Sequence, residues 1–385
     1  MSEPTPRIVA WETTRACPLA CVHCRAEAQY EPDPQQLTTV EGKALLEDIA
    51  SFAKPVVIMT GGEPLMREDI FELCAYGDSL GLRMAISPDD GRLLTPETVA
   101  RLKASGVRRA SFSLHYTNAE QNDYFARTDG AFANAMRGLA NMRVGGLPFQ
   151  INTTVTKLNV DDLPAMLKLV QELGAQAWHV FLLVPTGRGK AIESQEIPPE
   201  QYESTLNWLY DMQQITPIEI KETCAPHFRR IQLQRRQEQR RSTSPPEYVA
   251  PSGHGGLTSH GGGHPHGAAG SSRGCMSGDG FCFVSHIGEV FGCGYLPVLA
   301  GNVRERPFRE IYQQSSLFKE LRDLGKLKGK CGRCEYRQIC GGCRARAYAA
   351  TGDYLADEPY CIYEPGSYRR KHSSPTSQAG TLTND

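Results

Sequence analysis

Three cysteines near the N-terminus are close enough in sequence to share one metal centre. They form the pattern Cys17-x3-Cys21-x2-Cys24, directly after a short apolar run. Thiolates are soft metal ligands, and three of them on one tight loop can hold three irons of a 4Fe–4S cluster and leave the fourth iron open. Because a small molecule can chelate an open iron, the spacing predicts a reactive cluster rather than a closed one.

A zinc knuckle is the competing interpretation of this motif. Structural zinc takes four ligands and favours pairs of CxxC turns. His23 offers a fourth ligand, but it lies between Cys21 and Cys24, and its coordination would strain the loop. The iron–sulfur interpretation is therefore favoured.

A second motif, Thr60-Gly61-Gly62-Glu63-Pro64, follows the next apolar run along the chain. Paired glycines allow close approach to the backbone, and a carboxylate can receive an ammonium group. Alone, such a sequence could be only a turn. One strand after the cysteine motif, it predicts an amine-binding site beside the cluster.

Cysteine is also concentrated near the C-terminus, within a total of thirteen in 385 residues. The residues concerned are Cys275, Cys282, Cys293, Cys331, Cys334, Cys340, Cys343 and Cys361. Their CxxC pairs suit iron–sulfur clusters, and structural zinc sites are an open alternative. Cys74 and Cys224 belong to neither group. We expect Cys74 to be a buried small residue, whereas Cys224 fits either the core or a substrate pocket.

The elements that must position these motifs alternate between strand and helix. Strands are predicted at Ile8–Thr14, Val56–Thr60, Leu82–Ser87, Arg109–His115, Phe149–Val155 and Ala177–Val184. Helices are predicted at Thr39–Ala53, Arg67–Leu80, Pro96–Ser105, Ala131–Val144, Asp162–Leu173 and Pro199–Met212. Such alternation builds an α/β fold with a parallel sheet, and ligands bind at the carboxyl ends of its strands. Six units that close only partly form an open barrel.

Composition divides the chain into four expected regions. These are the barrel (1–222), a bridging helix with a Gly/His-rich flexible linker (223–272), a cysteine-rich domain (273–366) and a disordered tail (367–385). The linker contains His254, His260, His264 and His266. A metal-binding tract is the alternative interpretation, but glycine-rich composition favours a flexible linker.

Charge and hydropathy exclude several classes of protein. The formal net charge is −1 and the isoelectric point is about 6.8, which argues against a general binder of nucleic acids or membrane surfaces. No apolar stretch is long enough to cross a bilayer, and the N-terminal sequence lacks the pattern of a secretory signal. We therefore expect a cytoplasmic protein, in which clustered cysteines are more often metal ligands than disulfides.

Together the two N-terminal motifs resemble the radical S-adenosylmethionine (SAM) superfamily. The resemblance implies a partial (β/α)6 TIM-like barrel whose 4Fe–4S cluster is held by Cys17, Cys21 and Cys24. It implies that SAM chelates the open iron, that the GGEP backbone and Glu63 face its amino group, and that reductive cleavage gives a 5′-deoxyadenosyl radical. By the same resemblance, less specific SAM contacts are Ser87, Ser113, Thr154 and Val184, for each of which a packing role fits equally well.

The C-terminal cysteines resemble a SPASM domain, which holds auxiliary iron–sulfur clusters. The resemblance implies one cluster on Cys275, Cys282, Cys293 and Cys343. It implies a second cluster on Cys331, Cys334, Cys340 and Cys361. Two residues separate Cys340 from Cys343 where the common pattern has three. This departure leaves open both the partition of ligands and the choice between one and two auxiliary clusters.

Longer stretches, including WETTRAC, INTTVTKLN, TCAPHF and GEVFGCGYLPVLAGNV, resemble one subgroup, the radical SAM enzymes of haem synthesis. These include haem b synthases and enzymes of haem d1 formation. The implied substrate is iron-coproporphyrin III, with propionates on rings A and B that become vinyl groups with loss of carbon dioxide. A flavodoxin or ferredoxin is the implied electron donor, and an auxiliary cluster is a plausible acceptor for the electron that leaves the substrate.

An acidic macrocycle requires cationic partners, for which arginine forks are suited. The candidates are Arg15, Arg188, His227, Arg229, Arg230, Arg344 and Arg346. Tyr295 and Tyr348 are candidate pocket walls. His227 or Cys224 is a hypothetical axial ligand of the substrate iron, because both lie in the TCAPHF stretch.

Other functions compete with this interpretation. Ser87-Pro-Asp-Asp-Gly91 and Leu114-His115-Tyr116 depart from the patterns usual at the SAM end of the barrel, which allows a different substrate. A peptide-modifying SPASM maturase that forms thioether or carbon–carbon bonds is one alternative, although only about seven residues precede the first predicted strand. Another tetrapyrrole-modifying enzyme is a second alternative, and a non-catalytic iron–sulfur or zinc scaffold is a third.

Overall fold

The computed structural model describes residues 3–243 and 273–367. The predicted histidine-rich tract and nearly all of the predicted tail lie outside these residues.

A single open sheet runs through the described chain, in the order β10-β9-β8-β1-β2-β3-β4-β5-β6-β7. Its first seven strands are parallel to one another: β1 (Ile8–Glu12), β2 (Val56–Thr60), β3 (Arg83–Ile86), β4 (Arg109–Ser113), β5 (Phe149–Val155), β6 (Ala177–Leu182) and β7 (Glu219–Thr223). The six predicted strands are confirmed. The prediction missed β7, whose sequence Glu-Ile-Lys-Glu-Thr has no apolar run to signal it.

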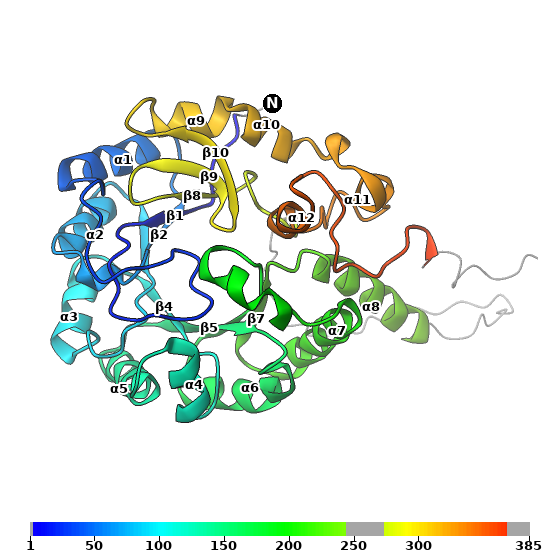
Figure 1. The fold of residues 1–385 in the computed structure, drawn as a ribbon, viewed down its shortest axis with the longest axis horizontal. Helices are drawn as coiled ribbons and strands as arrows, with labels where there is room; N and C mark the ends of the chain where they lie inside the picture. Colours follow the sequence, from blue (N-terminus) through cyan, green and yellow to red (C-terminus); the bar gives the residue numbers. More distant parts are fainter. Residues whose placement is uncertain (1–2, 244–272, 368–385) are drawn as a thin grey trace, which may run out of the picture.

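The C-terminal region continues the same sheet. Its strands are β8 (Phe281–Val284), β9 (Glu289–Cys293) and β10 (Leu296–Asn302). β8 pairs in parallel with β1, whereas β9 and β10 add in antiparallel fashion (Figure 1). The first strand is therefore an interior strand, covered on one side by the barrel and on the other by the C-terminal region.

Helices cover the outer side of the curved sheet (Figure 1). Those of the first part are α1 (Thr39–Phe52), α2 (Ile70–Ser79), α3 (Pro96–Ala104), α4 (Ala119–Ala126), α5 (Ala131–Val144), α6 (Leu163–Glu172), α7 (Pro199–Ile215) and α8 (Phe228–Thr243). Those of the C-terminal part are α9 (Phe308–Gln314), α10 (Ser316–Arg322), α11 (Gly329–Arg333) and α12 (Arg344–Thr351). Short 3-10 turns occur at η1 (Pro64–Met66), η2 (Val160–Asp162), η3 (Gly187–Gln195) and η4 (Leu324–Lys326).

The helix starts follow from local chemistry. Thr38 and Glu41 form a capping box at the start of α1, and Thr95 caps α3 with Pro96 at its first position. The prediction missed α4, which is short and polar on much of its surface.

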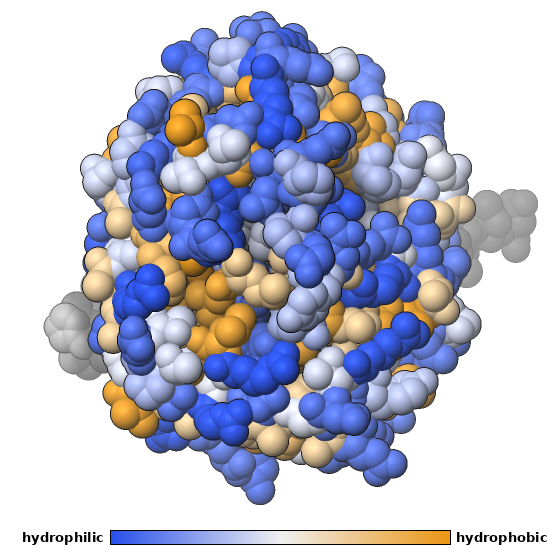
Figure 2. Space-filling view, turned by 60° about the vertical axis from the view of Figure 1, so that its left-hand side comes forward, coloured by the Kyte–Doolittle hydropathy of each residue, from blue (hydrophilic) through white to orange (hydrophobic). Residues whose placement is uncertain are grey.

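The molecular surface is mainly hydrophilic, with a group of hydrophobic residues near the centre of the face in Figure 2. In residues 3–243 and 273–367, no helix is long and apolar enough to span a membrane.

Candidate active site

The N-terminal cysteine motif lies on a loop that follows β1 and is held from two sides. Val22 donates a backbone hydrogen bond of 3.0 Å to Phe125 at the end of α4. From η3, the guanidinium of Arg188 donates to the backbone oxygens of Cys21 and Ala28 at 2.9 and 2.7 Å. Arg188, a predicted substrate partner, therefore holds the cluster loop.

Backbone N–H groups point at the thiols of this loop. Leu19 donates to Cys17 Sγ at 3.4 Å, and Ala28 donates to Cys24 Sγ at 3.5 Å. N–H donors of this kind stabilise the negative sulfur of a cluster and adjust its reduction potential. The donor set and its surroundings therefore fit a 4Fe–4S cluster.

His23 is used in packing. Its ring meets His115 edge-on at 4.4 Å between centroids and stacks on Phe125 at 4.6 Å. Burial lowers the pKa of His23 to about 4, with a further contribution from Arg188, so the ring is neutral near pH 7. This arrangement anchors the loop and gives no support to a zinc-ligand role.

The two glycines of the GGEP motif lie against the backbone that leads into the cysteine loop. A Cβ atom on Gly61 would be 2.4 Å from the oxygen of Thr14, and one on Gly62 would be 2.4 Å from the oxygen of Ala16. The N–H of Gly62 donates to Thr14 at 2.8 Å, and that of Glu63 donates to Ala16 at 2.7 Å. Glycine is therefore required because two backbone segments meet there.

The carboxylate of Glu63 is buried and accepts three backbone hydrogen bonds. Leu65 donates at 3.0 Å, and both Asp89 and Asp90 donate at 2.8 Å. Burial raises the pKa of Glu63 to about 8, although the three N–H donors favour the ionised form. The side chain thus ties the GGEP loop to the loop after β3. Its contact with the amino group of SAM stays a prediction.

A second carboxylate, Asp89, lies near the cluster loop. Its Oδ1 accepts a 2.9 Å hydrogen bond from the backbone of Ser113. Its charge acts on the thiols of Cys17 and Cys21, and burial raises the pKa of Asp89 to about 6. Sequence reasoning noted this residue only as a departure from the usual pattern. Asp89 is therefore a half-buried acid beside the cluster loop.

The less specific SAM contacts fall into two groups. Ser87, Ser113 and Thr154 are half-buried at the carboxyl ends of β3, β4 and β5, the predicted ligand edge. Val184 is buried in an apolar group around the C-terminal cysteines. Burial agrees with a packing role for Val184, and all four contacts with SAM stay predictions.

Four C-terminal cysteines line one cavity. They are Cys331, Cys334, Cys340 and Cys361. Gly342 donates its N–H to Cys340 Sγ at 3.4 Å, and Glu358 donates to Cys331 Sγ at 3.4 Å. His227 and Arg230 line the same cavity. This is one of the two ligand sets implied by the sequence, and its thiols and N–H donors fit a 4Fe–4S cluster.

One tight turn places its two cysteines in different cysteine groups; it is the turn Cys340-Gly341-Gly342-Cys343. Gly341 and Gly342 have φ of +76° and +63°, a conformation that favours glycine. Cys340 lines the cavity just described, whereas Cys343 lies near Cys293. The short spacing is therefore compatible with interleaved ligand sets.

The other group contains Cys275, Cys293 and Cys343, whose thiols interact electrostatically. Tyr295 donates its N–H to Cys293 Sγ at 3.5 Å. The structure does not bring Cys282 to this group. Cys282 is fully buried on β8, between β1 and β9, and packs in the main core. Among the described residues, no three His, Cys, Asp or Glu side chains have the arrangement of a single-ion site.

A cavity of about 370 Å³ lies between the N-terminal cysteine loop and the C-terminal strands. Arg25, the neighbour of Cys24 in sequence, lines it, and so does Cys293. The predicted pocket walls Tyr295 and Tyr348 both belong to its lining. The cavity therefore extends from the side of the SAM motif to an auxiliary cysteine.

Most of the predicted cationic partners of the substrate lie outside the lining of this cavity. Arg15 lines the cavity, together with Arg25 and Lys190, but Arg188, Arg229, Arg230, Arg344 and Arg346 do not. The acids that line it are Glu12, Glu27, Glu193 and Glu289. Neither Cys224 nor His227 is part of the wall, so the TCAPHF stretch offers no axial ligand to an iron bound there.

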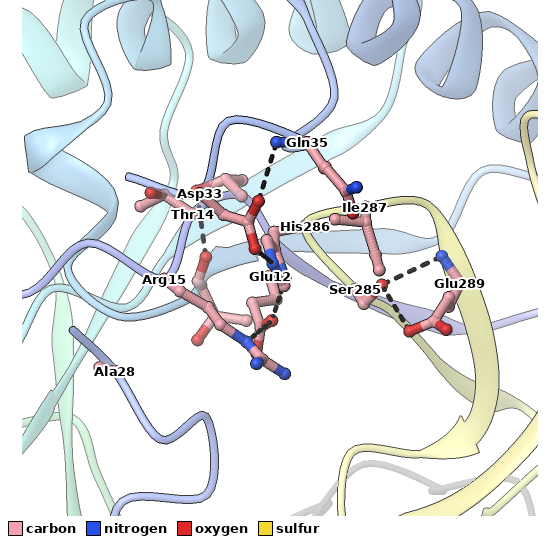
Figure 3. A network of polar contacts seen from close by, with 12 residues as sticks. Glu12, Thr14, Arg15, Ala28, Asp33, Gln35, Ser285, His286, Ile287 and Glu289 are labelled. Carbon is pink, nitrogen blue, oxygen red and sulfur yellow. Dashed lines mark hydrogen bonds and ion pairs between the residues drawn. The ribbon is translucent and has the colours of Figure 1, made fainter. Parts of the chain in front are cut away.

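A buried ionic network links the two parts of the chain beside this cavity (Figure 3). Glu12, at the end of β1, pairs with Arg25 at 2.7 Å and with His286 Nδ1 at 2.8 Å, and His286 Nε2 is 3.1 Å from Asp33. Burial opposes ionisation, but Arg25 and His286 outweigh it and lower the pKa of Glu12 to about 2. Sequence reasoning missed this network because no local motif joins residues so far apart.

Comparison with known proteins agrees with these arrangements. Residues 11–170 match the model of the radical SAM superfamily, and residues 275–344 match that of the SPASM iron–sulfur cluster-binding domain. The chain is 49% identical to the AdoMet-dependent heme synthase of Methanosarcina barkeri, over 94% of this chain and 97% of that relative. It belongs to the family of radical SAM heme synthases.

More distant similarities support the fold of this radical SAM enzyme. The Fe-coproporphyrin III synthase of Methanosarcina barkeri is 32% identical over 92% of this chain and 87% of that protein. The crystal structure of Streptococcus suis SuiB bound to S-adenosylmethionine superimposes with a TM-score of 0.70 at 15% identity, covering 94% of this chain and 78% of that one. SAM and 4Fe–4S clusters are thus the cofactors, and the zinc and non-catalytic alternatives are set aside.

Proposed function

We propose that this enzyme converts two propionate side chains of iron-coproporphyrin III into vinyl groups and so forms haem b. The observation that carries the proposal is the single cavity that reaches from Arg25, beside Cys24, to Cys293. A substrate in it would lie between the cluster that cleaves SAM and an auxiliary cluster. The similarity to AdoMet-dependent heme synthases supports the choice of substrate class.

The reaction requires a source of radicals at one end of such a cavity and an electron acceptor at the other. When bound, SAM and its cluster supply a 5′-deoxyadenosyl radical, and an auxiliary cluster supplies an electron acceptor. Each propionate loses one hydrogen atom from its β-carbon to the radical, which becomes 5′-deoxyadenosine. The substrate radical then loses carbon dioxide and one electron, and a carbon–carbon double bond forms. For each propionate, one SAM would be consumed and one electron would enter from an external donor, for which we propose a flavodoxin or ferredoxin. One electron would leave the substrate radical to the auxiliary cluster, so the two electrons balance.

The residues of the cavity have separate tasks in this proposal. Arg15 and Lys190 bind the carboxylates that are not reacting, because they are the cations of the wall nearest to solvent. Tyr295 contacts a flat face of the macrocycle, whereas the ring of the buried Phe283 supports the guanidinium of Arg25 at 4.3 Å. Arg25 pairs with Glu12 through Nη2 at 2.7 Å, so it shapes the cavity. Arg15 also contacts Glu12, through Nε at 3.3 Å, and we assign carboxylate binding to its Nη groups.

The decisive experiment is an anaerobic assay of the reconstituted enzyme with SAM, a strong reductant and iron-coproporphyrin III. Mass spectrometry should show stepwise loss of two carboxyl groups, with one 5′-deoxyadenosine released for each. The Cys17→Ala variant is the control and should release neither product. SAM cleavage with an unchanged porphyrin would reject this substrate and direct the search to other tetrapyrroles or to a peptide, as a SPASM maturase requires.

A further inference from the structure

Cys224 lies at an unusual point of the backbone. It follows β7 and has φ of +61°, a conformation that residues with a side chain rarely adopt. Its carbonyl oxygen is held from two directions, by the hydroxyl of Tyr202 at 2.9 Å and by Nη1 of Arg346 at 2.8 Å. A strained residue that the surrounding structure holds so firmly indicates a functional constraint.

The thiol of Cys224 is directed into the first auxiliary group. This thiol interacts most strongly with the thiol of Cys343 and also interacts electrostatically with Cys293. Cys224, Cys293 and Tyr295 all pack against the buried cluster that contains Cys343 and Val184. Cys224 therefore follows the last strand of the barrel and lies among cysteines of the C-terminal region.

Among the described residues, no cysteine acts electrostatically on the thiol of Cys282. Its electrostatic neighbour is Arg322, and its side chain is enclosed in the apolar core with Val284 and Val290. To reach the other thiols, Cys282 would have to leave an interior strand of the sheet. The position that the resemblance to SPASM domains implied for Cys282 is thus available to Cys224.

We propose that Cys224 is the fourth thiolate ligand of the auxiliary cluster held by Cys275, Cys293 and Cys343. This inference concerns the protein alone and is independent of which substrate the enzyme takes. Four thiolates leave no iron open, so this cluster exchanges electrons with the substrate across the cavity wall without binding it. Arg346 contributes the nearby positive charge that a buried anionic cluster requires.

The test compares Cys224→Gly with Cys282→Ala. Glycine removes the thiol and accepts a φ of +61°, so the fold of Cys224→Gly is expected to be kept. Both substitutions are made in a background with Cys17, Cys21 and Cys24 replaced by alanine, so that only auxiliary clusters contribute. After anaerobic reconstitution, iron and sulfide are measured, and electron paramagnetic resonance spectra are recorded before and after oxidation with ferricyanide.

Cys224→Gly should either lose about half of the cluster iron or keep a cluster that loses one iron on oxidation and gives a 3Fe–4S signal. Cys282→Ala should keep the iron content and the spectrum of the parent and only lower its melting temperature. The proposal is overturned if Cys224→Gly matches the parent in both readouts, or if Cys282→Ala is the variant that loses a cluster. Both readouts are independent of porphyrin, so failure of the proposed substrate would leave this result unaffected.

Discussion

At the scale of single residues, the site depends on short distances that only a few side chains permit. Gly62 lies where the GGEP loop meets the backbone that leads into the cysteine loop. A methyl group there would be 2.4 Å from the oxygen of Ala16 and 2.7 Å from that of Arg15. The neighbouring atoms belong to backbone and cannot give way without moving the cysteine loop.

We therefore expect Gly62→Ala to destabilise the protein by several kcal/mol, at the upper end of single substitutions, and to reduce cluster incorporation. Gly352→Ala is the matched control. Gly352 has φ of +75°, but beyond its chain neighbours no atom of the described residues lies within 4 Å of the added methyl group, so about 1 kcal/mol is expected there. Melting temperatures and iron content measure both effects. Equal losses in the two variants would show that the close approach at Gly62 is unimportant.

Arg15 provides a second prediction at this scale. Replacing Arg15 with Gln should weaken the binding of iron-coproporphyrin III about tenfold, because a charge-assisted hydrogen bond to a propionate contributes about 1.5 kcal/mol. Fluorescence or absorbance titration measures the affinity. Arg108→Gln, at an exposed position paired with Asp78, should leave the affinity unchanged. SAM binding should be the same in both variants, and equal porphyrin affinity in the two would remove Arg15 from the site.

At the scale of elements, the ends of β1 and of the β8–β9 turn are joined by buried charges. Glu12 of β1 meets His286 of the turn, while Arg25 comes from the cysteine loop. The end of β1, the cysteine loop and the β8–β9 turn also contribute residues to the lining of the proposed substrate cavity. The network therefore sets the position of the C-terminal strands relative to the loop that holds the first cluster.

The acid stability of the protein should depend on Glu12. A lowering of its pKa from 4.5 to about 2 corresponds to about 3 kcal/mol of stability. Because the folded pKa is depressed, this contribution is present above pH 4.5 and is lost as the pH falls toward 2. Glu12→Gln should therefore be less stable than the parent at pH 7, and the difference should shrink at pH 3. Denaturant unfolding of the apoprotein at both pH values measures it, and a difference that does not change with pH would contradict the assignment.

At the scale of the whole molecule, barrel and C-terminal region form one structure. The continuous sheet passes through β1 into β8, and one core contains Val9, Trp11, Cys282, Phe308 and Phe318. Glu41 of α1 also pairs with Arg304 of the C-terminal part at 2.7 Å. The barrel and the C-terminal region therefore stabilise each other and do not form two independent domains joined by a linker.

A chain that ends at residue 243 should consequently fail to form a stable monomer. Its β1 edge would present unpaired backbone groups and apolar side chains to solvent, which favours aggregation. The full-length apoprotein should unfold in one transition followed by both circular dichroism and tryptophan fluorescence. Two separate transitions, or a soluble and folded 1–243 fragment, would show that the barrel is an independent domain.

The sequence by itself predicted the first cluster, the GGEP loop and six strands of the barrel. The reason is physical: Cys17, Cys21 and Cys24 are neighbours on one loop, and buried parallel strands require continuous apolar runs that are visible in the chain. The polar strand β7 and the polar helix α4 lacked that signal.

Only the tertiary structure decided which distant residues meet. It brought Cys224 beside Cys343, enclosed Cys282 in the core, and paired Glu12 with His286. It also left Arg15 as the one predicted cation of the described residues that lines the proposed substrate cavity. Sequence spacing cannot give these contacts. The contact of Glu12 with His286 and the burial of Cys282 follow from the addition of β8 to the edge of β1. That pairing joins segments far apart in the chain and depends on the packing of the whole sheet.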